Sequence, residues 1–471
     1  MLPRALAQNL PELGEGSSTT LPPHVERKIG EGIMREIRAR EPSYLDDPEL
    51  FDYLNQLGSR LVAAVPGARQ DFHFFAVRDP SINAFALPGG FVGVHTGLVT
   101  SAEGESEVAS VLGHEIAHVT QRHIARMLGQ QQQMALPGLI AMAAALLLGR
   151  SRPDLAQGAI MAAQGAAAQA QLSYSRDFER EADRIGFQTL NSAGFDVRAM
   201  ASFFERMQRS TRVMDDGSFP GYLRSHPVTT ERIADAQSRA ANMPYRQHPD
   251  SLDFHLVRAK LRAESGDPRD AVNEFTAAVG DRRYANETAA RYGLAVALLR
   301  AKRPAEAQAE LAKLGDRVKE SSLFVTLAAR IRQAQGKGAE ALAILKEGVP
   351  RWPERRSVVY AYAEALAAQG RSDELLAVIA PQLRQYPRDE RLHEMEAKAF
   401  STLGKRLRQH QAQAEVYALR GSIPAAIEQL QLARAAGDGN FYELSVVEAR
   451  LKELRAEHAR DLKEKDTRKK F

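Results

Sequence analysis

The chain has 471 residues, a formal net charge of +4 and no cysteine. Its length exceeds that of one compact domain and predicts two or three domains. The lack of cysteine excludes disulfide bridges, thiolate metal ligands and cysteine nucleophiles. Lysine and arginine are spread along the chain, apart from a short basic tail at the C-terminus, so we do not expect the protein to bind nucleic acid.

The N-terminal segment 1–23 is polar and rich in Gly, Ser and Pro, and we expect it to be a flexible leader. Within it, Ala5-Leu6-Ala7 has the A-x-A pattern that ends a secretory signal peptide, but the basic and apolar regions that should precede this pattern are absent. Two interpretations stay open. The signal peptide is truncated in this numbering, or the pattern is a chance occurrence in an alanine-rich chain.

Five segments before residue 100 have the periodicity of regular structure: helical over 24–38 and 47–65, and strand-like over 72–78, 83–87 and 91–95. Asp47-Pro48 is a start signal for the second helix. The last two strands flank Pro88-Gly89-Gly90, which predicts a hairpin. The sequence therefore predicts a small sheet immediately before a helix that spans about 104–128.

Two apolar, alanine-rich segments follow, at 135–149 and 155–170. Each is shorter than the roughly 20 residues that a membrane-spanning helix needs. We therefore predict no transmembrane span. The segments form either a buried helix pair or a mobile element that covers the site or contacts a membrane surface.

From about residue 250 the strand signals disappear and helix-turn-helix units recur. Their turns have similar sequences and begin at Gly266, Lys302, Gly336, Gly370, Gly404 and Gly421. Successive turns from 266 to 370 lie 36, 34 and 34 residues apart. A 34-residue period of paired helices is typical of tetratricopeptide repeats. Segment 247–471 therefore resembles this family, which implies an all-α solenoid with a concave surface for a protein partner. A helical bundle without a binding role is the alternative.

The segment His114-Glu115-Ile116-Ala117-His118 has the H-E-x-x-H pattern. His114 and His118 lie one turn apart on the same helix face, so both imidazoles can reach one metal ion. Glu115 lies about 100° further around the helix, beside the metal rather than on it. Its carboxylate can there take a proton from a water molecule, as the general base of a metallopeptidase does.

A third ligand is available on a later helix. Glu179 and Asp183 are again one turn apart, so the first can bind the metal while the second hydrogen-bonds a ligand histidine. Glu181 points to the other side and is expected to be solvated or salt-bridged. Two histidines and a glutamate, with a fourth position open, form a catalytic zinc site rather than a structural one.

Two other histidines, His123 and His226, differ in the roles that the sequence allows them. His123 lies nine residues after His114, about 180° around a continuous helix, and should not reach the same metal. His226 is a structural turn residue, a donor to the oxyanion of the reaction, or a fourth zinc ligand that keeps the enzyme latent. Arg232 is a second candidate for stabilising the transition state.

The H-E-x-x-H motif, followed by E-x-x-A-D at 179–183, resembles the M48 peptidase family. Segment 83–90 (NAFALPGG) and segment 224–232 (RSHPVTTER) resemble the stretches that flank the zinc helix there. The resemblance implies an α+β zincin-like metallopeptidase domain, mostly helical with a small sheet, over 24–246. The integral-membrane members have several long spans, and their absence here removes prenylated substrates from consideration.

The resemblance also implies the composition of the site. One Zn²⁺ ion is held by His114, His118 and Glu179, with Glu115 as the general base. The hairpin forms an edge strand to which an extended substrate adds by main-chain hydrogen bonds. The substrate-binding residues implied in this way are Asn83, Ala84, Phe85, Gly89 and Gly90, and the further catalytic candidates are Asp183, His226 and Arg232.

Together these features predict a zinc-dependent endopeptidase that acts on unfolded or misassembled proteins. With the repeats appended, the whole chain resembles periplasmic members of the family, which implies a periplasmic location and a role in outer-membrane protein quality control. The repeats would recruit clients or an outer-membrane assembly complex. Two alternatives remain: a chaperone or adaptor whose zinc site is latent, and a membrane-surface protease that uses segment 135–170.

Overall fold

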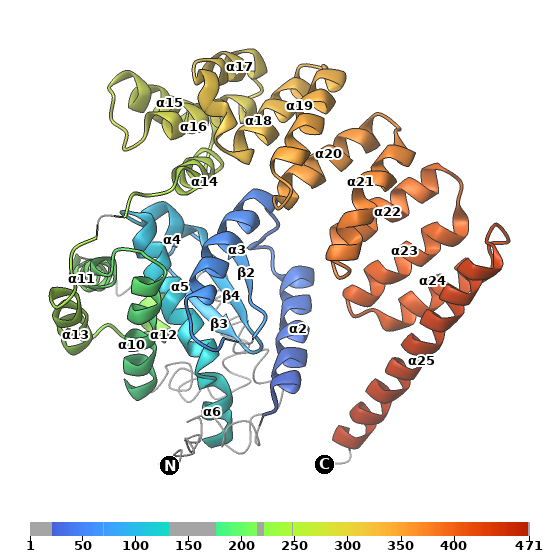
Figure 1. The fold of residues 1–471 in the computed structure, drawn as a ribbon, viewed down its shortest axis with the longest axis horizontal. Helices are drawn as coiled ribbons and strands as arrows, with labels where there is room; N and C mark the ends of the chain where they lie inside the picture. The colour runs from blue at the N-terminus through green and yellow to red at the C-terminus, as the bar shows by residue number, and fades with distance from the viewer. Residues whose placement is uncertain (1–20, 69, 131–175, 214–220, 247, 470–471) are drawn as a thin grey trace, which may run out of the picture. The chain divides into compact units, whose positions relative to one another are not determined.

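The computed structural model describes residues 21–68, 70–130, 176–213, 221–246 and 248–469 (Figure 1). The chain divides into two compact units, Met1–Arg262 and Ala263–Phe471. The predicted leader, apart from its last residues, and both apolar segments lie outside the described residues.

The N-terminal unit contains a four-stranded sheet with the strand order β1-β2-β4-β3. Its strands are β1 (Tyr44–Leu45), β2 (His73–Val77), β3 (Ala84–Leu87) and β4 (Phe91–His95). Strands β3 and β4 form the predicted antiparallel hairpin, and β2 pairs with β4 in parallel. Among the described strands β3 pairs with β4 alone, which makes it the edge strand on the side of the hairpin.

Helices cover both faces of this sheet, which explains why its strands are almost completely buried. Helix α2 (Pro23–Arg40) packs its Ile33 and Met34 against the large side chains Phe75 and Phe85 of one face. Helices α3 (Pro48–Ala63) and α5 (Glu105–Thr120) contact β2, β3 and β4. The side chains of alternate strand residues point to opposite faces, so those of β3 that share the face opposite Phe85 are alanines. Small side chains there allow α5 to lie close to the edge strand.

Helix α3 begins where the sequence predicts. Asp47 is its N-cap, and one oxygen of its carboxylate accepts hydrogen bonds from the N–H groups of Glu49 and Leu50, each at 3.0 Å. The other oxygen lies 2.5 Å from the Nζ atom of Lys260, on helix α14 (Leu252–Ala263). The same Nζ lies 2.5 Å from the Glu49 carboxylate. The Lys260 side chain is 5% exposed, so it pairs with two carboxylates away from water.

We expect Lys260→Met to lower the free energy of unfolding by about 3–5 kcal/mol, because it leaves two buried carboxylates without their cation. Urea denaturation followed by circular dichroism measures the change. The control is Lys313→Met, because Lys313 pairs with Glu310 at 53% exposure and its loss should cost less than about 1 kcal/mol. Equal effects of the two changes would contradict the assignment.

The prediction of one continuous helix over 104–128 is wrong, because the structure has two helices in this segment. Helix α5 ends at Thr120, and α6 (His123–Gln130) begins after a turn at Arg122, whose φ is 54°. This left-handed conformation is unfavourable for a residue with a side chain. Two contacts with the N-terminal part of the chain hold it: the Arg122 guanidinium is hydrogen-bonded to the Glu26 carboxylate and to the Leu21 carbonyl.

Helix α10 (Arg176–Ser192) lies along α5 at close range. The approach depends on two glycines, because a Cβ atom on Gly186 would lie 3.0 Å from the amide nitrogen of His114 and Gly113 faces it across the contact. The two helices that carry the predicted metal ligands are therefore held side by side. The remaining helices of this unit are α4 (Thr96–Ser101), α11 (Arg198–Val213), α12 (Gly221–Ser225) and α13 (Thr230–Ala241).

The C-terminal unit consists of paired helices, as the 34-residue period predicts. Beside the end of α14 and a short 3₁₀ helix, η1 (Gly315–Lys319), the described helices are α15 (Pro268–Gly280), α16 (Glu287–Arg300), α17 (Pro304–Ala312), α18 (Ser322–Ala334), α19 (Gly338–Arg351), α20 (Arg356–Ala368), α21 (Ser372–Gln385), α22 (Glu390–Thr402), α23 (Arg406–Leu419), α24 (Ile423–Ala435) and α25 (Phe441–Lys469). Turn positions at Gly266, Lys302, Gly336, Gly370 and Gly404 all have positive φ. The repeated turn sequences therefore reflect one repeated backbone conformation, which glycine adopts without strain.

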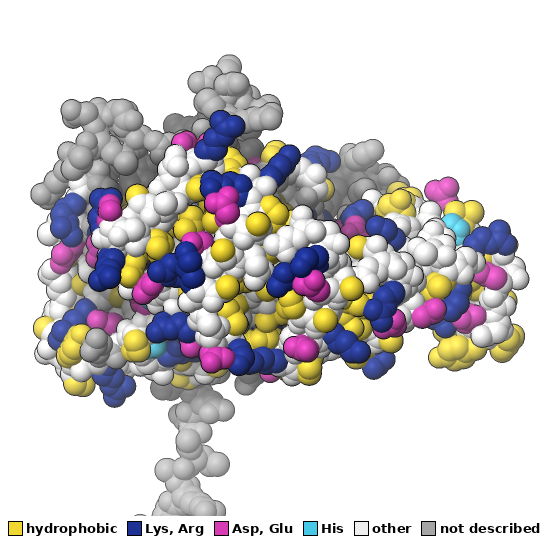
Figure 2. Space-filling model, turned by 90° about the horizontal axis from the view of Figure 1, so that it is seen from above, with side chains coloured by type: hydrophobic (Ala, Val, Ile, Leu, Met, Phe, Trp, Pro, Cys, Tyr) yellow, Lys and Arg dark blue, Asp and Glu magenta, His cyan; other side chains and the backbone are white. Residues whose placement is uncertain are grey.

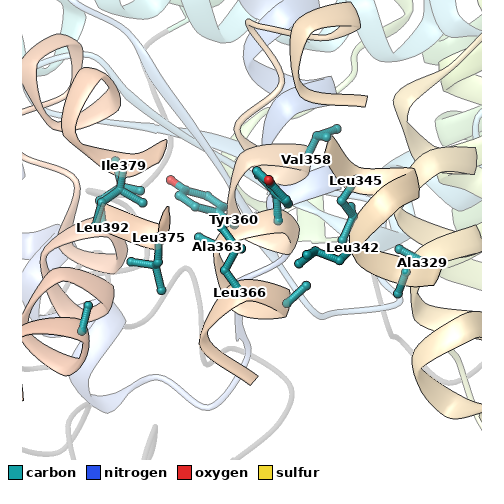
Figure 3. Packing of buried hydrophobic residues seen from close by; sticks show 14 residues of the cluster. Ala329, Leu342, Leu345, Val358, Tyr360, Ala363, Leu366, Leu375, Ile379 and Leu392 are labelled. Carbon is teal, nitrogen blue, oxygen red and sulfur yellow. The ribbon is translucent and has the colours of Figure 1, made fainter. Parts of the chain in front are cut away.

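One cluster of buried side chains joins helices α18 to α22, and a second joins α23 to α25. Leu342 and Leu345 of α19 meet Val358 and Leu366 of α20, and the cluster continues to Leu392 of α22 (Figure 3). The turn at Gly421 connects α23 to α24 and falls half a repeat out of register with the earlier turns. The turn at Gly437, 33 residues after Gly404, keeps the register.

Acidic and basic side chains alternate over the face seen in Figure 2, and no single sign of charge dominates it. This agrees with the spread of charge along the sequence. Within the described parts of the chain, no helix is both long and apolar enough to cross a membrane.

Candidate metal centre

Four side chains converge on one buried point: His114 and His118 of α5, Glu179 of α10, and His226, which follows α12. One potential ligand atom from each lies within 4.8 Å of the others. Each residue is at most 3% exposed. Three of the four are the predicted metal ligands, and the fourth is the histidine for which the sequence left three roles open.

The facing atoms can be identified from their distances. His114 Nε2 lies 3.0 Å from His118 Nε2 and 3.2 Å from His226 Nδ1. Glu179 Oε1 lies 2.9 Å from His226 Nδ1 and 3.4 Å from His118 Nε2. Neighbouring ligands of a tetrahedral zinc ion, each about 2.0–2.1 Å from the metal, are about 3.3 Å apart. The four residues therefore fit a single zinc ion, although the structure contains no ion.

The charges around this point favour a cation. Burial raises the pKa of Glu179, but the charges of His226 and His114 outweigh burial and hold that pKa well below its ordinary value. Burial lowers the pKa of His114, but Glu179 and Asp183 reverse this and raise it to about 9. The Glu179 and Asp183 carboxylates that favour a proton on His114 would also attract a metal ion, whereas burial holds the pKa of His118 well below its ordinary value.

Glu115 lies beside the cluster and is fully buried. Burial raises its pKa, and the charges of His226 and His114 and the backbone N–H of Ala86 offset part of this effect. Its Oε1 atom lies 3.4 Å from His226 Nε2. A carboxylate with a raised pKa, next to the metal position, has the properties of a general base.

Asp183 and Arg232 lie behind the ligands. An oxygen of Asp183 is 2.9 Å from His114 Nδ1, which orients that imidazole with Nε2 toward the cluster. Arg232, on α13, binds both oxygens of Asp183 at 2.7 and 2.8 Å and reaches Glu179 Oε2 at 2.8 Å. The structure thus places the Arg232 guanidinium against two buried carboxylates of the cluster, and its predicted part in stabilising the transition state stays a prediction.

His123 lies outside the four-residue cluster, as expected, but the reason for that expectation is wrong. Because the helix breaks at Arg122, His123 turns back, and its Nδ1 atom lies 2.8 Å from His118 Nδ1. Its Nε2 atom lies 3.2 Å from Glu181. Glu181 is salt-bridged to Arg126 at 2.8 Å, one of the two alternatives expected for it.

The pairing register of β3 fixes which of its main-chain groups point away from β4. The N–H of His95 donates to the carbonyl of Asn83 at 3.0 Å, so these two residues form a hydrogen-bonded pair. In an antiparallel ladder such pairs alternate, so Phe85 also points its main-chain groups toward β4. Ala84 and Ala86 then direct theirs toward the outer edge. Ala86 was absent from the predicted substrate-binding set, because only the register reveals it.

The other predicted substrate-binding residues contribute differently. The Phe85 side chain is 2% exposed and packs in the core against α2. Gly89 and Gly90 form the hairpin turn with φ of 77° and 89°. The turn is fixed by α2, because Arg27 donates a 2.7 Å hydrogen bond to the carbonyl of Gly89. These residues shape the hairpin that carries the edge.

The segment that carries His226 touches the same edge. The N–H of Tyr222 donates to the carbonyl of Ile82 at 3.1 Å, and Ile82 precedes β3 on the side of Ala84 and Ala86. The Tyr222 ring stacks on His226 at 4.9 Å between centroids. Nothing in the local sequence marks Tyr222, because its role depends on contacts between distant segments.

Comparison with known proteins agrees with this geometry. The model of peptidase family M48 matches residues 48–240, and a tetratricopeptide repeat model matches residues 262–331. The β-barrel assembly-enhancing protease of Yersinia pestis is 32% identical over 95% of this chain and 91% of its own length. That of Escherichia coli is 31% identical over 95% and 92%. The chain belongs to peptidase family M48.

A putative β-barrel assembly-enhancing protease of Vibrio cholerae is 41% identical over 55% of this chain and 54% of that protein. The match to family M48 confirms the expected enzyme class, a metallopeptidase. The match to the repeat model confirms the expected architecture of a small-sheet peptidase domain followed by helical repeats. The M48 match includes both His114 and Arg232, so the whole cluster lies within the family's domain.

Proposed function

We propose that this M48 peptidase is a zinc-dependent endopeptidase that cleaves unfolded or misassembled proteins and is latent at rest. The observation that carries the proposal is the buried cluster of three predicted ligands and His226 around one point, with Glu115 beside it. A bound zinc ion would supply a Lewis acid for the scissile carbonyl and a lowered pKa for an attacking water molecule.

The protein's own residues do the rest of the chemistry. Glu115, beside the proposed metal position, would accept the proton of the attacking water and pass it to the leaving amine. Asp183 keeps His114 in the orientation that points Nε2 to the metal position. Arg232 holds Asp183 through hydrogen bonds and Glu179 through an ion pair at 2.8 Å.

The substrate would lie along β3. The main-chain groups of Ala84 and Ala86 point to the outer edge, and the N–H of Ala86 also faces Glu115. An extended polypeptide pairing with this edge therefore passes next to the general base. Recognition through main-chain groups requires an unfolded segment and little side-chain specificity, which fits a quality-control protease.

His226 supports latency. Its Nδ1 atom lies 2.9 Å from Glu179 Oε1 and its Nε2 atom 3.4 Å from the proposed base Glu115, which supports a role as the fourth ligand. The attacking water molecule would have to occupy that fourth metal position and contact Glu115, so His226 would exclude it. Because Tyr222 of the same segment binds Ile82 at the edge strand, release of this segment would free the metal position and the substrate edge together.

We expect His226→Ala to raise cleavage of an unfolded protein at least severalfold, because it vacates the fourth position without removing Glu115 or the three other ligands. Cleavage of a reduced, unfolded model protein by the purified chain measures this. The control is His255→Ala, a histidine of the same unit outside the donor cluster, which should leave the rate unchanged. A lower rate for His226→Ala would instead assign it to stabilisation of the oxyanion.

The names of the relatives support a place for the protein in outer-membrane protein assembly, and hence in the periplasm. The repeats would recruit clients or an assembly complex through their concave surface. The test is a comparison of an unfolded β-barrel protein with its folded form as substrate of His226→Ala. We expect cleavage of the unfolded form only.

A chaperone or adaptor function is the second candidate. The observation that favours it is the position of His226, because a site closed by this histidine would leave the repeats to carry the function. If neither the parent chain nor His226→Ala cleaved any unfolded substrate, while the parent chain still suppressed its aggregation, the repeats would carry the function. Equal cleavage of folded and unfolded forms would contradict the quality-control proposal.

A further inference from the structure

One buried histidine contacts the metal centre without belonging to it. His123 is completely buried. Its Nδ1 atom lies 2.8 Å from Nδ1 of the proposed ligand His118, on the side of that ring facing away from the other ligands. Its Nε2 atom lies 3.2 Å from a carboxylate oxygen of Glu181, and Arg126 Nη1 lies 2.8 Å from the same oxygen.

The direction of these hydrogen bonds follows from the ligand role. If His118 Nε2 is directed at the metal, it carries no proton, so the proton of the neutral ring is on Nδ1 and must be donated. His123 Nδ1 is then the acceptor, which places the proton of the His123 ring on Nε2. That proton is donated to Glu181, whose charge is balanced by Arg126.

The same pattern supports the other ligand histidine. His114 Nδ1 faces Asp183, and Asp183 is held by Arg232. His114 and His118 therefore each have an acceptor behind the ring, and in both cases the carboxylate involved is paired with an arginine. For His118 the chain uses His123 as a relay between the ring and the carboxylate.

We propose that His123 is a positioning residue of the metal centre, which fixes the tautomer and ring orientation of His118 through a chain from His118 to His123, Glu181 and Arg126. This inference rests on the metal site of the proposed function. The local backbone conformation brings the two histidines together. The left-handed turn at Arg122 redirects His123 toward His118, and without that turn a continuous helix would carry His123 to another face.

A packing role is the competing explanation, because the His123 ring stacks on Phe178 at 4.6 Å with an interplanar angle of 10°. Two substitutions separate the roles. His123→Phe keeps an aromatic ring against Phe178 but removes the acceptor. His123→Asn loses most of the stacking but places an amide oxygen near the position of Nδ1, where it can accept from His118.

The experiment measures the dissociation constant for Zn²⁺ by competition with a chromophoric chelator, using the full chain after metal removal. Visible absorption of the Co²⁺-loaded chain reports the ligand geometry. Loss of an outer hydrogen-bond partner of a ligand typically weakens metal binding about 10–100-fold. We expect His123→Phe to show this loss and a changed Co²⁺ spectrum, and His123→Asn to bind within a few-fold of the parent chain.

The reverse order, with His123→Phe close to the parent chain and His123→Asn weak, would overturn the proposal and leave a packing role. Equal binding by all three chains would overturn it as well. A parent chain that bound no zinc would overturn the metal site itself, and with it this inference.

A second pair of variants keeps the test decisive if His123→Phe fails to fold, as judged by circular dichroism. Glu181→Ala removes the acceptor of the His123 Nε2 proton at a side chain that is 21% exposed. We expect it to weaken zinc binding several-fold. Glu231→Ala removes a carboxylate that pairs with neighbouring Arg180 at 68% exposure, and should leave binding unchanged. Equal affinities of these two variants would overturn the proposal.

Discussion

Replacement of Glu115 by glutamine is expected to abolish cleavage of unfolded protein while leaving the metal ion bound. The two side chains have nearly the same shape, and Glu115 is not among the four converging ligands. The amide cannot accept the proton of the attacking water. General acid–base catalysis by a positioned side chain contributes about 10²–10⁴-fold, so we expect at least a 100-fold loss of rate.

The measurement compares cleavage rates with and without Glu115→Gln, in the parent chain and in His226→Ala, so that latency does not hide the effect. Zinc content is determined for each preparation. Glu103→Gln, a change at a side chain that is 71% exposed, is the matched control and should keep full activity. Residual cleavage above one tenth of the control would exclude Glu115 as the base.

Glu179→Gln is expected to remove the metal ion. The change removes the only carboxylate among the four converging residues. With it goes the negative charge that interacts favourably with His114 and His226. Loss of a residue that only hydrogen-bonds a metal ligand weakens metal binding about 10–100-fold. Loss of a charged ligand itself should weaken it more. Cleavage should fall in parallel, and added zinc should restore it only at concentrations far above those that saturate the parent chain.

The control for Glu179→Gln is Asp177→Asn, on the first turn of the same helix. Asp177 is 87% exposed and pairs only loosely with Arg180, so neither zinc affinity nor cleavage should change. Treatment of the parent chain with a chelator should reproduce the phenotype of Glu179→Gln, with recovery on addition of zinc. If Glu179→Gln kept the affinity of the parent chain, another group would have to be the third ligand.

The convergence of His114, His118 and Glu179 could be anticipated because it depends on short-range geometry. Residues four apart on a helix share a face whatever the rest of the chain does, and this rule also paired Glu179 with Asp183. The meeting of the two helices was implied by family resemblance rather than by the residues themselves. Its structural basis, the contact between Gly113 and Gly186, becomes visible only in three dimensions.

The positions of Ala86, Tyr222 and His123 in the structure could not be anticipated, because each depends on a long-range feature. Ala86 faces outward only in the observed register of β3 and β4. Tyr222 reaches Ile82 across more than a hundred residues of chain. His123 was assigned to the far side of a continuous helix, whereas contacts between Arg122 and the N-terminal part of the chain break that helix.

The repeats were predictable for a different reason. The positive φ at each turn favours glycine, so the same residue recurs at the same interval and the period is visible in the sequence. The turn at Gly421 shows the limit of this signal. Its glycine has the same conformation but lies between two pairs rather than within one, and the sequence alone does not distinguish the two.

The close contact of α5 with α10 bears on how often such an enzyme could be switched on and off. The predicted ligands His114, His118 and Glu179 lie on α5 and α10, which are in close contact at Gly113 and Gly186. His226 instead lies on the segment that follows α12. Displacing that segment would remove one of the four proposed ligands and leave the other three in place. Each round of activation would then cost a local loop movement and no exchange of metal with the surroundings. The speed of response would depend on the loop alone, and the enzyme would return to rest with its ion still bound.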